Sequence, residues 1–153
     1  MTIYEELLEE AKNSGLVVRE KPLSGSDGRI FRNRIAISDR LRTSTEKACV
    51  LAEEMGHHFT AVGNIIDQMN IENLKQEQKG RLRGYNRMIG LRGIISAFHA
   101  GCQNRYEVAE HLHVTEEYLQ EAIDCYTGKY GECTTVDNYV IYFIPNLAVM
   151  EMI

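Results

Sequence analysis

The 153-residue chain has few of the features that mark secreted or membrane proteins. Its cysteines form no C-x-x-C pair and no dense framework, so neither a disulfide-stapled module nor a cysteine zinc site is expected. The first ten residues, MTIYEELLEE, lack the positive start and unbroken apolar core of a signal peptide. No run of about 18 apolar residues occurs, which argues against a membrane-spanning helix. We therefore expect a cytoplasmic protein without a membrane partner.

Positive charge is also scarce, with 17 Lys and Arg against 22 Asp and Glu and a formal net charge of −5. This balance argues against a surface built for nucleic acid. Residues 105–131 have a helix-turn-helix pattern with Thr115 as the cap of the second helix, but residues 116–124 contain no Lys or Arg. Acidic side chains stand there instead: Glu116, Glu117, Glu121 and Asp124. They would repel a phosphate backbone, so direct nucleic-acid binding is not expected and the helix pair is interpreted as a packing or partner-recognition element.

The spacing of apolar residues predicts a mainly helical α+β fold. The chain length suits one domain. Strands are expected at residues 16–20 and within 29–38, and a hairpin about Pro145 and Asn146 is expected within 138–152. Helices are expected at residues 2–13, 43–63, 73–101 and 105–131, with a break in the third of them because its interior contains four glycines.

The helix predicted at residues 43–63 has the clearest boundaries. Thr43 or Ser44 can cap its start, and Glu46 stands at capping-box distance from Thr43. Gly63 offers an end. The apolar residues inside it recur on one face: Ala48, Leu51, Ala52 and Met55.

This helix carries the stretch LAEEMGHHFT, which resembles the metallopeptidase pattern H-E-x-x-H with its first residue changed to Glu53. Positions i and i+4 of a helix project side by side, so Glu53 and His57 can hold one metal ion. Glu54 then stands where a general base would act on a metal-bound water. The alternative pairing of Glu54 with His58 is worse, because it puts Met55, which cannot move a proton, at the base position.

The chemistry of this motif leaves two interpretations open. A carboxylate is an accepted zinc ligand, although a second anionic ligand weakens the acidification of bound water and makes Mn²⁺ or Fe²⁺ more competitive. Equally, E-E-x-x-H occurs by chance on solvated helices, so an ordinary charged face remains the alternative. His58 is more simply a structural or exposed residue, and Asp67 is either a partner that orients His57 or an ordinary loop acid. Basic residues at 79–92 are either a solvated face or a grip for phosphates or an acidic partner.

The surroundings of the motif resemble the ImmA/IrrE family of metallo-endopeptidases, especially its phage and integrative-element branch with A-E-E-L-G-H. The resemblance begins with TEKACVLAEEMGHHFTAVGNIIDQ (45–68) and continues in KQEQKGRLRGYNRMIG (75–90). It extends through residues 100–131 and the terminal VDNYVIYFIP (136–145), and so covers nearly the whole chain.

The resemblance implies a zincin-like minimal metallopeptidase fold and a specific site. Glu53, His57 and the downstream Glu77 are the implied ligands of Zn²⁺, with Mn²⁺ or Fe²⁺ as alternatives, and Glu54 is the implied catalytic base. Residues 1–93 would form the metallopeptidase-like part. Residues 94–153 would form a helical segment with a C-terminal hairpin, packed with the first part as one compact unit.

The resemblance also implies a partner, since family members cleave helix-turn-helix repressors that keep prophages and mobile elements silent. The expected function is therefore cleavage of a phage or mobile-element repressor. A second hypothesis is a non-catalytic antirepressor that acts by binding the repressor, motivated by Glu53 in place of histidine and by the residues around Glu77. The sequence does not define the oligomeric state.

Overall fold

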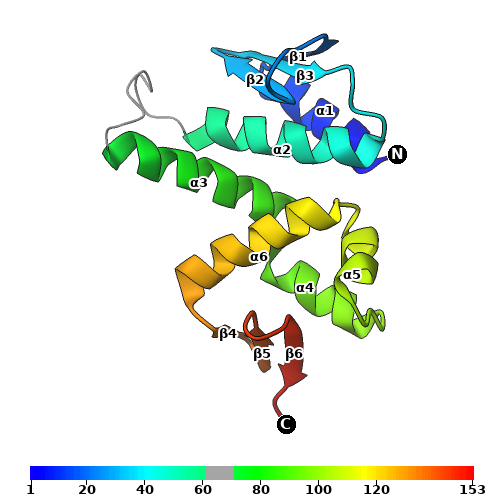
Figure 1. Ribbon diagram of the computed structural model, residues 1–153, viewed down its shortest axis with the longest axis vertical. Helices are drawn as coiled ribbons and strands as arrows, with labels where there is room; N and C mark the ends of the chain where they lie inside the picture. The colour runs from blue at the N-terminus through cyan, green and yellow to red at the C-terminus, as the bar shows by residue number, and fades with distance from the viewer. Residues whose placement is uncertain (61–70) are drawn as a thin grey trace. The chain divides into compact units, whose positions relative to one another are not determined.

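The computed structural model describes residues 1–60 and 71–153, except the side chains of residues 71–74 and 76. The chain divides into two compact units, Met1–Tyr85 and Asn86–Ile153, which are described separately (Figure 1). The division expected after residue 93 falls inside a helix. The predicted mainly helical α+β fold is confirmed, with a small sheet in each unit. Within the described residues, no helix combines the length and apolar character needed to cross a membrane.

The first unit begins with helix α1 and a three-stranded sheet in the order β1-β3-β2. The middle strand β3 runs parallel to β1 and antiparallel to β2, so β1 and β2 are the edges. Helices α1 and α2 pack beside this sheet (Figure 1), and Ile35 and Ile37 of β3 are buried in the core. The predicted helix and strands are confirmed with these bounds: α1 Ile3–Asn13, β1 Val17–Lys21, β2 Gly28–Phe31 and β3 Arg34–Ser38.

Helix α2, Ser44–Thr60, begins at the predicted capping box. The Glu46 backbone N–H donates to Thr43 Oγ1 at 3.1 Å, and the Thr43 backbone N–H donates to Glu46 Oε1 at 3.2 Å. The two bonds satisfy backbone donors that have no partner inside the helix. The predicted apolar face is buried as expected. Gly63, the expected end of the helix, lies outside the described residues.

The helical pattern at residues 73–101 is interrupted, as its glycines predict. Helix α3 covers Ile71–Met88 and helix α4 covers Gly90–His99. The chain turns at Gly90, whose φ of +66° is a left-handed conformation that a side chain disfavours. The break therefore falls at one glycine, while Gly80, Gly84 and Gly93 stay inside helices.

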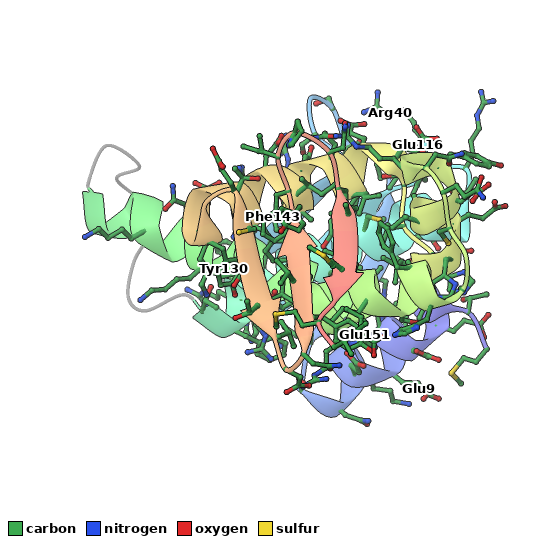
Figure 2. All side chains as sticks on the ribbon, turned by 90° about the horizontal axis from the view of Figure 1, so that it is seen from below. Glu9, Arg40, Glu116, Tyr130, Phe143 and Glu151 are labelled. Atoms are coloured by element: carbon green, nitrogen blue, oxygen red, sulfur yellow. The ribbon has the colours of Figure 1, made fainter. Side chains whose placement is uncertain are left out.

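The second unit contains α4, the helix pair α5 and α6, and a sheet in the order β4-β5-β6. The Thr115 hydroxyl caps α6 by accepting from the Tyr118 N–H at 3.0 Å, as predicted. The predicted hairpin is present, and β4 adds a strand that the sequence pattern did not predict. Figure 2 shows Tyr130 beside Phe143, whose ring centroids lie 6.3 Å apart. The bounds are α5 Arg105–Leu112, α6 Glu116–Tyr130, β4 Cys133–Val136, β5 Tyr139–Tyr142 and β6 Ala148–Glu151.

Tyr4 of α1 makes the unfolding free energy of the first unit fall at alkaline pH. Burial, and secondarily the charge of Glu20, raise the Tyr4 pKa above its ordinary value of 10.0. Because the Tyr4 pKa is higher in the folded chain than in the unfolded chain, the neutral Tyr4 side chain contributes its full stabilisation below about pH 10. This contribution is lost as the pH rises through the Tyr4 pKa of the folded chain. We expect Tyr4→Phe to reduce the fall in unfolding free energy between pH 8 and pH 11, measured by urea denaturation. An unchanged fall would show that other groups cause it.

Candidate metal centre

Three of the four predicted site residues lie together on α2. Glu53 and His57 occupy one face, four residues apart, and His57 Nε2 lies 3.8 Å from Glu53 Oε1. Glu54 is the next residue along the helix from Glu53, and all three side chains are partly buried. The helix alone therefore brings the imidazole of His57 next to the Glu53 carboxylate, as the i, i+4 spacing predicts, with Glu54 adjacent to them.

Glu54 faces the edge strand β2, where Gly28 makes room for it. A Cβ atom at Gly28 would lie 3.2 Å from Glu54 Cγ and 3.3 Å from Glu54 Oε1. The same atom would lie 2.5 Å from Val50 Cγ1, one helical turn earlier. A side chain at this position would push against both residues, so Gly28 allows the strand to pass directly beside the Glu54 carboxylate.

Helix α3 runs alongside α2 (Figure 1), and glycines line the contact between the two helices. A Cβ atom at Gly56 would collide with the backbone carbonyl oxygen of Gly80 and would lie 3.3 Å from the nitrogen of Gly84. A Cβ atom at Gly80 would lie 2.7 Å from His57 Nδ1. At these positions the backbones of α2 and α3 approach each other more closely than a residue with a side chain would permit. Glu77 lies one turn before Gly80 on α3, so this approach brings it toward His57.

Arg81 links the carboxylates of the two helices. Its Nη2 donates to Glu77 Oε1 at 3.2 Å, and its Nε lies 3.5 Å from Glu53 Oε1. One guanidinium thus contacts Glu53 from α2 and Glu77 from α3. In the sequence, Arg81 stood out only as one of the basic residues at 79–92. Its place four residues after Glu77 is the signal that could have identified the pair.

The charges in this cluster shift the pKa values of all three residues of α2. Contact with His57 lowers the Glu53 pKa, and the charge of Arg81 lowers it further against the effect of burial. Contact with Glu53 raises the His57 pKa, helped by the charges of Glu54 and Glu77. Burial raises the Glu54 pKa against the opposing charge of His57, and the charges of Glu53 and Glu77 add to the rise. Glu54 therefore holds a proton more readily than an ordinary glutamate does.

The kinds of donor in this cluster fit a divalent cation. Two carboxylates and one imidazole are ligands that Zn²⁺ accepts, and the oxygens also suit Mn²⁺ or Fe²⁺. Their arrangement is different: among the described residues, no group of three His, Cys, Asp or Glu side chains is placed to hold a metal ion. The guanidinium of Arg81 forms ion pairs with both Glu53 and Glu77. In the present arrangement the Oε1 atoms of both carboxylates contact Arg81 rather than a shared ion.

Other histidines have separate partners. The ring of His58 lies edge-on to Phe59, with centroids 5.2 Å apart. In the second unit, His99 Nε2 is 2.9 Å from the Tyr139 hydroxyl, and His111 Nε2 is 3.2 Å from the Ser96 hydroxyl. These contacts suit structural roles. Asp67, considered above as a partner for His57, lies outside the described residues.

A glutamate beside an i, i+4 pair of ligand-type side chains is the arrangement of a metallopeptidase helix. A family model described as the IrrE N-terminal-like domain, a peptidase family, matches residues 11–124. The match covers most of the 153 residues and includes both α2 and α3. The chain therefore belongs to the ImmA/IrrE family of metallopeptidases, as its resemblance indicated. Searches of curated proteins and of solved structures gave no match.

Proposed function

We propose that this chain is a metal-dependent endopeptidase that cleaves a helix-turn-helix repressor of a phage or mobile element and so relieves repression. The observation that carries the proposal is the position of Glu54, a base with a raised pKa, beside the Glu53–His57 pair. Glu77 on the neighbouring helix supplies a third donor. Family membership supports the peptidase chemistry, and the resemblance to repressor-cleaving members supports the substrate.

In this mechanism Glu53, His57 and Glu77 would hold the metal, and Glu54 would move protons. The bound cation supplies polarisation of the scissile carbonyl and acidification of a water molecule. Glu54 accepts the proton of that water and then delivers it to the leaving amine. Its carboxylate lies on the same helix as the Glu53–His57 pair, so it could reach a water held by that pair.

The edge strand β2 offers a place for the peptide. An edge strand presents backbone N–H and C=O groups to which an extended segment can add by main-chain hydrogen bonds. Strand β2 is an edge of its sheet, and Gly28 within it lies against Glu54. A repressor segment paired with β2 would therefore pass beside the proposed base.

A second candidate function is a non-catalytic antirepressor that binds the repressor and leaves it intact. Arg81 favours it, because this residue already neutralises the two carboxylates that the metal would need. The acidic helix α6, which begins with Glu116 and Glu117, also suits recognition of a basic partner surface.

The two candidates separate in one experiment. The full chain, supplied with zinc, is mixed with each helix-turn-helix repressor encoded in the same mobile element, bound to its operator DNA. The proposal predicts that the repressor appears as two fragments by mass spectrometry and leaves the DNA. Release of intact repressor would establish the second candidate, and repressor that stays intact and bound would reject both for that substrate.

A further inference from the structure

The side chain of Arg81 contacts both implied carboxylate ligands, Glu53 on α2 and Glu77 on α3. It lies in the same cluster as His57, which is 3.8 Å from Glu53. Within the described contacts, its partner atoms are the Oε1 atoms of Glu53 and Glu77, the same kind of oxygen that a divalent cation would take. A cation bound through these same two Oε1 atoms would compete with the guanidinium for them.

We propose that Arg81 is an internal counter-cation that competes with the metal for Glu53 and Glu77 and so sets the metal affinity of the site. This inference rests on the proposed function, since it assumes that these carboxylates hold a metal. Without metal, the positive charge of Arg81 attracts the carboxylates of Glu53 and Glu77 and keeps them close together. Metal binding then requires that the guanidinium be displaced into solvent.

Exposure decides how strong this competition is. The Arg81 side chain is 50% exposed, and Glu53 and Glu77 are 36% and 34% exposed. Ion pairs this open to water are weak, because solvent screens them and two flexible side chains must be held in one geometry. A divalent cation bound directly by carboxylates can therefore displace Arg81. Arg81 reduces the affinity without closing the site.

The neighbouring Arg83 has a different contact. Arg83 lies two residues further along α3, and its guanidinium carbon lies 4.2 Å from the centroid of the Phe59 ring. Both arginines are exposed on the same helix and carry the same charge. The substitution Arg83→Gln is therefore a matched control for Arg81→Gln, because it removes an equal charge without freeing either carboxylate.

The test is isothermal titration of Zn²⁺ alone into the full chain and the two variants at low ionic strength. We expect Arg81→Gln to bind Zn²⁺ about two- to thirty-fold more tightly than the unmodified chain, the range set by two exposed ion pairs. Arg83→Gln should show a much smaller change. The difference between the two variants should shrink at high salt, where exposed ion pairs are screened. Binding by Arg81→Gln alone would also support the inference.

Other outcomes would overturn the inference in distinguishable ways. Equal affinity of Arg81→Gln and the unmodified chain would reject competition while leaving the metal site in place. Weaker binding by Arg81→Gln would make Arg81 a positioning residue that aligns the ligands. If all three folded proteins bind no Zn²⁺, the metal site itself is rejected, and with it the proposed peptidase function.

Discussion

Replacing Glu54 by Gln is expected to slow repressor cleavage by about 10²–10⁴-fold, the usual contribution of a general acid–base group. Glutamine has nearly the same shape, but it cannot accept a proton from water. Glu54 stands outside the implied ligand set, so the variant should bind as much metal as the unmodified chain. Cleavage is measured with metal-loaded protein, and metal content is measured on the same samples.

The control for this result is Glu9→Gln, which removes an exposed carboxylate from α1. It should leave both cleavage and metal content unchanged. If Glu54→Gln cleaved the repressor at the normal rate, Glu54 would not be the base. If the variant lost its metal, Glu54 would belong to the ligand set, and the assignment of Glu53 as a ligand would need revision.

Replacing Gly56 by Ala is expected to lower the free energy of unfolding of the first unit by about 1–3 kcal/mol, the usual cost of overpacking. The new methyl group would meet the backbone carbonyl of Gly80, which cannot rotate away as a side chain would. Relief requires that α2 and α3 move apart. Because that movement carries Glu77 away from His57, the metal affinity should fall as well. Urea denaturation and zinc titration measure the two effects.

Gly128 provides the matched control, since it also lies within a helix but has open space where a Cβ atom would stand. Gly128→Ala should stabilise the second unit by up to about 1 kcal/mol, because alanine has the higher helix propensity. If both substitutions had the same effect, glycine at position 56 would not be needed for the close approach of α2 and α3.

Local sequence signals predicted the elements that local chemistry determines. The capping box of Thr43 and Glu46 and the Thr115 cap each depend on residues within one turn of the chain. A break among the glycines of residues 73–101 was also predicted, but not its position at Gly90. Strand β4 was missed because its four residues directly follow a long helix. Its pairing with β5 across the Asp137–Asn138 turn, rather than its own pattern, makes it a strand.

The site was predictable only in part, because some of its contacts also depend on residues that are distant in the sequence. The spacing of Glu53 and His57 on one helix follows from helix geometry, and the structure places them together. Glu77 came from the family resemblance alone, because no local pattern indicates which residue of a second helix reaches the first. The glycines at positions 56 and 80 and the two ion pairs of Arg81 depend on the crossing of α2 and α3. Helix propensity treats such glycines only as a cost.

The most direct test of the proposed metal centre is the metal content of the full chain, purified without chelator and analysed by inductively coupled plasma mass spectrometry. We predict about one equivalent of a divalent metal per chain, as a single shared site requires. The separate variants Glu53→Ala, His57→Ala and Glu77→Ala should each lose most of it while remaining folded by circular dichroism. A folded chain that holds no metal even after zinc is supplied, or variants that retain it fully, would contradict the proposed metal centre.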